Sequence, residues 1–579
     1  MSFKVKHLGQ IRFGNEIEDI LKLKGIECVE EFLNPNESCV EDCNHYDNII
    51  EARDCLVKHI SQNNTITLLV DCDCDGYTSA ALMYQYIRRI NDNVYVKVVI
   101  NNGKQHGLNG VINEIATDTS KLVVIPDAGT GDIVECRKLI EECGKDVIIL
   151  DHHNVKEGLK NPAIVVNNQL STSVNNKSLT GVGVCYKFAK MLDDYYNVEY
   201  ADDYLDLVAV GMIADSASMS QLETRYLVQC GMKQLSNKVY KNEFLSLVVE
   251  KKKYSMKNKV SFNGIGFYVT PLINALIRFG TFEQKELLFK ALCDHRLFVL
   301  RQRKGEGKYP IPLSEYVYKD CEQAHRKQKT QTEESVLKLS EEIEKHKLDK
   351  FPILICNAKD DVDKNSTGLV ANKLTNFYQK PCLLLRRIND VCTGSARGYK
   401  KSGISDFNNW CVQTGLFTKV QGHDNAFGVN IPFKNTDKLF ELVSKLPQVI
   451  EPTYCVYGTY DGSKLSTDIV KRIAQYEYVW GCEVEEPLFL TSNLVVNKFS
   501  VNLSGAKQNK IEVKYRNITF VKFALSGNLI AEYKKIIECG DSIKFDVVGK
   551  FRQFNGSAQI QVEDWTFEKS NIKANVFGV

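Results

Sequence analysis

The chain has 579 residues, of which 44% are hydrophobic and 25% are charged, and these ordinary globular values predict about three to five domains. A net charge of +2 excludes a uniformly basic surface, so a nucleic-acid site must be a local patch. A run of about 20 apolar residues is absent, which argues against a membrane span, and nineteen cysteines without regular spacing favour a reducing, cytoplasmic location.

Residues 1–60 show helical apolar spacing and are predicted to cover the edge of the adjoining domain. From Thr65 to Asp215, short apolar runs alternate with helical patterns. The predicted strands are 66–70, 94–100, 122–126, 147–150 and 163–166. This alternation is typical of a parallel sheet with both faces covered, in which ligands bind beyond the carboxyl ends of the strands.

Three aspartates alternate directly after the first predicted strand: Asp71, Asp73 and Asp75. Carboxylates this close raise each other's pKa and need a positive partner. A divalent metal is the expected partner, because magnesium, manganese and calcium prefer oxygen ligands. A surface loop rich in aspartate is the alternative interpretation.

Two further strands deliver ionisable residues to the same edge. Asp127 follows the strand 122–126, and Asp151, His152 and His153 follow the strand 147–150. Because the carboxyl ends of parallel strands share one edge, we expect these side chains to lie near the aspartates. A capping or packing role is the alternative for either histidine taken alone.

Asp215 ends a predicted helix, residues 204–215, that is apolar almost all round. A buried, unpaired carboxylate is costly, and binding a metal would satisfy it.

Residues 282–350 are predicted to be helical, and the pattern of their charged section is typical of a solvated linker helix.

The last part of the chain, from about residue 450, contains short alternating strands. The predicted strands are 454–457, 494–496, 511–515, 518–523, 542–551 and 559–564. Their spacing predicts a small antiparallel barrel. Lys544, Lys550, Arg552 and Phe554 interleave basic and aromatic side chains that suit a single nucleic-acid strand, with an ordinary solvated strand face as the alternative.

These motifs resemble those of the DHH phosphoesterases, and within that family the RecJ-type single-strand exonucleases. The acidic stretch is similar to the motif Asp-x-Asp-x-Asp-Gly, Asp127 in Pro-Asp-Ala-Gly resembles the second motif, and residues 151–153 form the motif that names the family. Residues 394–397 and 422–428 resemble the signatures of the DHH-associated domain, with Gln421 in place of its first glycine.

The resemblance implies an α/β fold. A parallel-sheet DHH domain and a DHH-associated α/β domain are joined by a long helix, and an all-β OB-like barrel comes after them. The segments expected on this basis are 1–60 for the helical cover, 61–280 for the DHH catalytic domain, 281–350 for the helical connector, 351–450 for the DHH-associated domain and 451–579 for the OB-like nucleic-acid-binding domain.

The resemblance also implies two Mn²⁺ or Mg²⁺ ions. The implied metal ligands are Asp71, Asp73, Asp75, Asp127, His152 and Asp215. Many relatives outside the RecJ branch have a histidine in place of Asp71, so this ligand is an open question.

Three residues are expected to be catalytic: Asp127, His153 and His423. The substrate-binding candidates are Lys104, His106, Arg278, Ser395, Arg397 and His423. Ser395 and Arg397 offer a hydroxyl and a bidentate guanidinium that suit a terminal phosphate. For Lys104 and His106, a plain solvated loop is the alternative.

The function implied by the resemblance is that of a two-metal phosphodiesterase, a 5′–3′ exodeoxyribonuclease that degrades single-stranded DNA to mononucleotides in repair, recombination or replication. A helicase or a single-strand-binding protein is a candidate partner, and no membrane is expected. One alternative is a phosphodiesterase for oligoribonucleotides or cyclic dinucleotides. Another is a non-catalytic DHH-fold scaffold in a replication complex.

Overall fold

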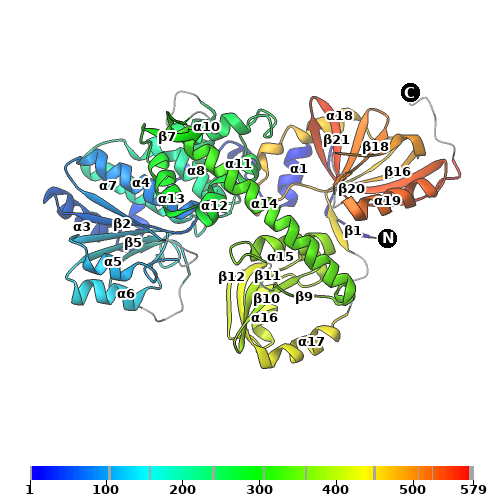
Figure 1. Ribbon diagram of the computed structural model, residues 1–579. Helices are drawn as coiled ribbons and strands as arrows, with labels where there is room; N and C mark the ends of the chain where they lie inside the picture. The colour runs from blue at the N-terminus through cyan, green and yellow to red at the C-terminus, as the bar shows by residue number, and fades with distance from the viewer. Residues whose placement is uncertain are drawn as a thin grey trace. The chain divides into compact units, whose positions relative to one another are not determined.

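The computed structural model describes residues 3–101, 106–154, 158, 160–237, 242–303, 307–358, 362–447, 452–505, 508–523 and 526–572 (Figure 1). The chain divides into two compact units. The first comprises Cys28–Arg326 and Tyr478–Glu485, and the second comprises Met1–Glu27, Lys327–Glu477 and Glu486–Val579. Among the described residues, no helix is both long enough and apolar enough to cross a membrane.

The first unit is built on a five-stranded sheet with the order β3-β2-β4-β5-β6. All its pairs are parallel, which confirms the parallel sheet predicted from the sequence. The strands are β2 (Ile66–Val70), β3 (Val96–Ile100), β4 (Leu122–Pro126), β5 (Asp146–Asp151) and β6 (Ile164–Asn167). The chain runs outward from β2 to β3 and then returns to the other side of β2, so the strand order reverses there.

Helices cover both faces of this sheet (Figure 1). On one face, α5 (Ile112–Thr117) and α6 (Ile133–Arg137) pack on alternate strand residues such as Leu69, Val123 and Ile149. On the other face lie α4 (Cys74–Ile90) and α7 (Gly181–Tyr196). Burial on both faces explains why the strands read as continuous apolar runs.

The rest of the first unit is mostly helical. Its helices are α2 (Val29–Leu33), α3 (Ile49–Ser61), α8 (Leu205–Ala214), α9 (Leu222–Ser236), α10 (Glu243–Lys252), α11 (Phe262–Tyr268), α12 (Thr270–Phe279) and α13 (Phe282–Leu292). Helix α8 is buried from Leu205 to Ile213, as its all-round apolar sequence predicts.

The segment predicted as a helical connector, 281–350, differs from expectation in one place. A hairpin of β7 (Phe298–Arg303) and β8 (Gly307–Pro312) precedes the long helix α14 (Leu313–Lys345). Phe298, Val299 and Leu300 are consecutive apolar residues, and the aromatic and β-branched side chains among them favour a strand.

The second unit contains a five-stranded sheet with the order β12-β13-β11-β10-β9. Its strands are β9 (Leu354–Asn357), β10 (Cys382–Ile388), β11 (Val391–Arg397), β12 (Lys419–His423) and β13 (Ala426–Pro432). Helices α14 and α15 (Thr367–Tyr378) pack on one face of this sheet. Helices α16 (Phe407–Gln413) and α17 (Thr436–Ser444) pack on the other.

The same unit holds a seven-stranded sheet with the order β15-β16-β20-β21-β19-β18-β17. Its strands are β15 (Gly458–Asp461), β16 (Phe489–Asn497), β17 (Val501–Ser504), β18 (Lys510–Tyr515), β19 (Ile518–Phe523), β20 (Ser542–Phe554) and β21 (Ser557–Lys569), accompanied by α18 (Thr467–Ala474) and α19 (Ser526–Glu538). The OB-like β domain is confirmed. Its strand pairs are mostly antiparallel, as expected, although β15 pairs with β16, and β19 with β21, in parallel.

The start of the chain also departs from the predicted helical cover. Residues 4–7 form strand β1 (Lys4–His7), which pairs in parallel with β14 (Thr453–Val456) in the second unit. Helix α1 (Glu16–Leu23) belongs to that unit as well, and its Glu16 carboxylate receives a hydrogen bond of 3.0 Å from Arg472 on α18. The division into five segments otherwise stays a prediction.

Arg225 on α9 is a fully buried cation that joins distant parts of the first unit. Its guanidinium donates hydrogen bonds to the carbonyl oxygens of Phe32 at 2.7 Å and Val479 at 3.0 Å. It also lies 3.9 Å from the centre of the Phe32 ring. These contacts tie helix α2 and the segment 478–485 to the core of the unit.

We predict that Arg225→Met lowers the free energy of unfolding of the first unit by about 3 kcal/mol, because buried carbonyl groups lose charged donors. Thermal unfolding followed by circular dichroism measures this change. Arg137→Met is the matched control, because Arg137 pairs with Glu141 on the surface and its side chain is 58% exposed. Equal unfolding temperatures for the two variants would contradict a structural role for Arg225.

Candidate active site

Three strand ends of the parallel sheet bring ionisable side chains to one edge, as predicted. Asp71 follows β2, Asp127 follows β4, and Asp151 ends β5. The edge lies at the reversal of strand order around β2, where sheets of this kind bind ligands. Several groups of side chains at this edge have ligand atoms close enough to share a cation, and two of these groups consist of predicted metal ligands alone.

The first group consists of Asp75, His152 and Asp215, whose ligand atoms all lie within 4.8 Å of one another. Asp75 is buried in the first turn of α4. Its carboxylate accepts hydrogen bonds from the backbone N–H of Gly181 at 2.7 Å and of Val182 at 3.2 Å, at the start of α7. Burial raises the pKa of Asp75 to about 6.

The second group consists of Asp71, Asp73 and Asp127, whose ligand atoms also all lie within 4.8 Å of one another. Asp73 caps helix α4, because its side chain accepts a hydrogen bond of 3.1 Å from the backbone N–H of Gly76. The two groups adjoin one another, since His152 Nε2 lies 3.2 Å from Asp127 Oδ1 and 3.6 Å from Asp215 Oδ2.

Asp127 is held in an unusual position. Its backbone φ is 62°, in the left-handed region, and its N–H donates to the Leu150 carbonyl at 2.7 Å. The buried Oδ1 atom accepts no hydrogen bond from the residues that the structure describes. Burial, and then the charges of Asp75 and Asp73, raise the pKa of Asp127 well above its usual range.

This donor set fits two hard divalent cations. It offers five carboxylates and one imidazole, and such ligands suit manganese and magnesium better than thiolate ligands would. The unpartnered Asp127 oxygen is the atom that a cation would satisfy. We therefore assign Asp75, His152 and Asp215 to one candidate position and Asp71, Asp73 and Asp127 to the adjoining one.

Asp151 has a role that the sequence did not reveal. Its Oδ2 accepts hydrogen bonds from the Thr130 backbone N–H at 3.1 Å and the Thr130 hydroxyl at 2.6 Å. Its Oδ1 accepts from the backbone N–H of His152 at 2.7 Å and lies 2.7 Å from Nδ1 of His153. Asp151 thus holds the backbone of His152 and the ring of His153.

These contacts set the charge state of the DHH motif. Burial opposes ionisation of Asp151, but the hydrogen bond with His153, the charges of both histidines and the hydrogen bond from Thr130 together outweigh it and hold the Asp151 pKa well below its usual range. Burial lowers the His153 pKa, but the hydrogen bond with Asp151 and the charges of the Asp151 and Asp215 carboxylates together outweigh it and raise that pKa to about 9. His153 therefore presents a half-exposed imidazolium, with 51% of its side chain accessible.

His106 contacts the acidic stretch directly. Its Nδ1 lies 2.5 Å from Asp71 Oδ2, and the neighbouring Gly107 N–H donates to Asp71 Oδ1 at 2.9 Å. The His106 ring centre lies 6.3 Å from that of His153, so both imidazoles lie on the same side of the site. Lys104 lies outside the described residues.

Arg278 is exposed in the last turn of α12. One helical turn earlier, Asn274 Oδ1 accepts a hydrogen bond of 3.1 Å from the backbone N–H of Cys74, at the start of α4. Residues four apart share a helix face, so Arg278 projects from the face of α12 that meets the start of α4. Asn274 was not among the predicted site residues.

Ser395 and Arg397 lie on β11 in the second unit, next to the start of helix α15. The Thr367 hydroxyl lies 3.1 Å from the Ser395 hydroxyl. A Cβ atom at Gly368 would lie 2.6 Å from Arg397 Nη2, so a larger residue at 368 would push the guanidinium out of its position. Two hydroxyls, a guanidinium and a helix N-terminus together form a candidate phosphate site. Thr367 and Gly368 were missed, because only the fold brings them to β11.

The backbone of His423 lies two strands from this group. His423 pairs with Ala426, and Ala426 pairs with Arg397. The side chain of His423 lies outside the described part of the chain.

On the OB-like domain, Arg552 forms ion pairs with Glu477 and Glu486, the latter at 2.5 Å, so its guanidinium is already engaged. Phe554 is 47% exposed.

Comparison with known proteins matches residues 65–212 to the N-terminal domain of the DHH family. YorK of Bacillus subtilis (strain 168), which carries the name of an SPbeta prophage-derived single-strand DNA-specific exonuclease, is 33% identical over 566 residues, 96% of each chain. The single-stranded-DNA-specific exonuclease RecJ of the same organism is 25% identical over 460 residues, 78% of this chain and 54% of that protein.

Solved structures show the same fold. RecJ from Thermus thermophilus in complex with Mn²⁺ superposes with a TM-score of 0.71 at 16% identity, over 97% of this chain and 79% of that one. The corresponding Mg²⁺ complex gives a TM-score of 0.65. The similarity thus extends beyond the DHH domain to nearly the whole chain.

We predict that Gly181→Ala weakens Mn²⁺ binding at least about tenfold without unfolding the chain. The added Cβ would lie 2.2 Å from Asp127 Oδ1 and would displace that carboxylate. Isothermal titration calorimetry measures the affinity, and circular dichroism checks the fold. Gly131→Ala is the control, because its Cβ would meet no atom within 4 Å. Unchanged affinity in Gly181→Ala would refute the assignment of Asp127 as a ligand.

Proposed function

The chain belongs to the DHH family, in the group of RecJ-type single-strand DNA-specific exonucleases, and on this premise we propose that it degrades single-stranded DNA from the 5′ end to mononucleotides. The observation that carries the proposal is the pair of adjoining ligand groups at the edge of the parallel sheet, joined at Asp127 and His152. Two cations held there would offset the charge of a phosphodiester and activate water for its hydrolysis.

The chain's own residues would orient the reaction. Asp151 holds the backbone of His152 and both the backbone and the ring of His153, so the His153 imidazole would keep one orientation during a turnover. The imidazolium of His153 is placed to donate a proton or a hydrogen bond to a phosphate oxygen or to the leaving oxygen. His106 and Arg278 are the substrate contacts proposed for this unit.

The group around Ser395 supports the proposed polarity. A terminal phosphate carries more charge than an internal phosphodiester, and Arg397 with two hydroxyls at a helix start offers the donors to bind it. An anchor for the 5′-phosphate would set both the direction of digestion and the size of the product. His423 is proposed as a further contact to the scissile phosphate.

The two alternatives have less support. A phosphodiesterase for oligoribonucleotides or cyclic dinucleotides has no need of the seven-stranded OB-like domain, because a short substrate needs no distant grip. A non-catalytic scaffold has no need of ligand groups, yet both are complete here. A cytosolic location, a helicase or single-strand-binding partner, and a role in DNA repair or recombination stay predictions.

We expect Asp127→Ala to lower the nuclease rate about a thousandfold or more, because a shared cation position loses its ligand. The assay uses single strands labelled at the 5′ or the 3′ end, with Mn²⁺ present. The unaltered protein should release mononucleotides from the 5′ label first. Release from 3′ ends alone would contradict the polarity, and cleavage of dinucleotides but not of long strands would favour the first alternative.

Arg397→Ala should raise KM for a 5′-phosphorylated strand about 10- to 100-fold, since charged hydrogen bonds to the terminal phosphate are lost. The preference for a 5′-phosphate over a 5′-hydroxyl should shrink by a similar factor. Arg387→Ala is the matched control on the neighbouring strand, where the guanidinium stacks 3.4 Å from the centre of the Phe433 ring. If Arg397→Ala keeps the full preference, the anchor lies elsewhere.

A further inference from the structure

A second cluster of metal-ligating side chains lies on the first unit, on residues that take no part in the proposed active site. Cys55 and His59 stand four residues apart on α3, so they share one face of that helix. Asp146, at the start of β5, completes the cluster. The ligand atoms of these three residues all lie within 4.8 Å of one another.

The surroundings already orient this cluster. His59 is buried, and its Nε2 lies 2.8 Å from Asp146 Oδ2, while its Nδ1 lies 3.0 Å from the side-chain amide of Asn64. To bind a metal through Nε2, His59 must carry its proton on Nδ1, so the Asn64 amide must turn its oxygen toward that nitrogen. Nε2 and Asp146 Oδ2 must also move slightly apart from 2.8 Å, because ligand atoms around Zn²⁺ lie about 3.3–3.8 Å apart.

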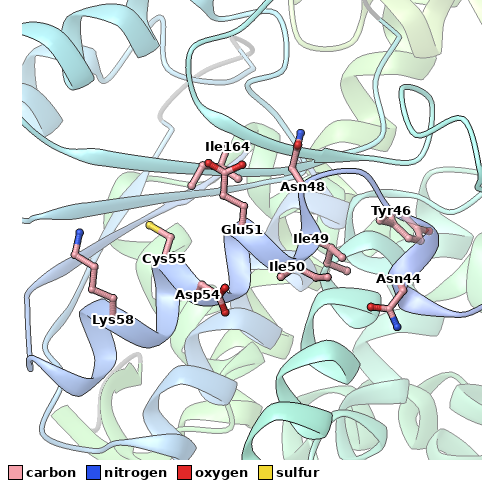
Figure 2. A pocket seen from close by; sticks show the side chains of 10 residues that line it. All are labelled: Asn44, Tyr46, Asn48, Ile49, Ile50, Glu51, Asp54, Cys55, Lys58 and Ile164. Atoms are coloured by element: carbon pink, nitrogen blue, oxygen red, sulfur yellow. The ribbon is translucent and has the colours of Figure 1, made fainter.

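Cys55 lines an open depression of about 720 Å³ between α3 and the edge strand β6. Figure 2 shows Cys55 and Lys58 on the α3 side of this depression and Ile164 of β6 across from them. The side chain of Asp146 is 46% exposed. A hydrated cation can therefore enter without opening the core.

Because it includes the Cys55 thiol, this cluster should prefer other cations than the site at the edge of the parallel sheet. The carboxylates and single imidazole there suit hard cations, whereas sulfur and nitrogen donors favour zinc, cobalt and nickel. A nucleophilic role for Cys55 has little support, because burial, and then the Asp146 carboxylate, raise its pKa to about 11. Coordination would release the thiol proton to solvent.

We propose that Cys55, His59 and Asp146 form a second metal site that takes a borderline-soft divalent cation such as Zn²⁺. The site fastens helix α3 to the start of β5, and solvent completes the coordination. Lys58 donates to Asp146 Oδ2 at 3.0 Å with a side chain that is 55% exposed, so it swings away when the cation binds.

Cobalt titration of the full chain tests this site separately from nuclease activity. A bound Co²⁺ with a cysteine ligand gives a thiolate-to-cobalt charge-transfer band in the near ultraviolet, which oxygen and imidazole ligands do not produce. We expect the band to reach its full intensity at one Co²⁺ ion per chain. The band should be lost in Cys55→Ser and weaker in His59→Gln. Cys143→Ser, which alters another partly exposed thiol, should keep it.

Two further measurements sharpen the test. Zn²⁺ should displace the Co²⁺ band and raise the unfolding temperature of the natural chain but not of Cys55→Ser. Lys58→Ala should tighten Co²⁺ binding, because it removes a competing cation, whereas a purely structural network would show no such gain. No band, or a full band in Cys55→Ser, would overturn the proposal. Mn²⁺-dependent nuclease activity should persist in Cys55→Ser, so failure here leaves the proposed function untouched.

Discussion

Mutual repulsion among buried carboxylates is the constraint on which the first unit depends. Asp71, Asp75 and Asp127 are almost completely buried, and burial together with neighbouring charge raises the pKa of Asp127. The fold offsets part of this cost with backbone N–H groups at the starts of α4 and α7. Divalent cations offset the rest, so the sheet edge, the two helix starts and the buried helix α8 all serve to hold charge in one small volume.

The sequence predicted the catalytic sheet well, because each strand is a short apolar run that ends in a polar residue. The runs ending at Val70, Pro126 and Leu150 leave little room for another interpretation, since burial on both faces gives continuous apolar strands. The pairing of β1 with β14 could not be predicted from the sequence, because it joins residues about 450 positions apart through a strand of only four residues. The parallel pair of β19 and β21 depends in the same way on distant contacts.

The candidate site was predictable where chemistry follows a strand, and not where tertiary structure supplies the partner. Asp73, Asp127 and His152 were found because they stand at strand ends in a recurring pattern. The orienting role of Asp151 depends on Thr130, which reaches it only in the folded sheet. The place of Gly368 in the candidate phosphate site is likewise visible only in the fold, where it approaches Arg397. No sequence pattern links a helix start to a strand that follows it by some 25 residues.

For the open question about Asp71, we propose an explanation based on charge. Many relatives outside the RecJ branch have a histidine, a neutral ligand, at this position. Here the hydrogen bond with Asp71 raises the pKa of His106 to about 12, so the two side chains form an anion and cation pair with no net charge. Each carboxylate oxygen retains a second lone pair, so the hydrogen bonds from His106 and Gly107 leave Asp71 able to bind a cation. An aspartate can therefore replace histidine at this position without making the cluster more negative, provided that an imidazolium 35 residues later closes onto it.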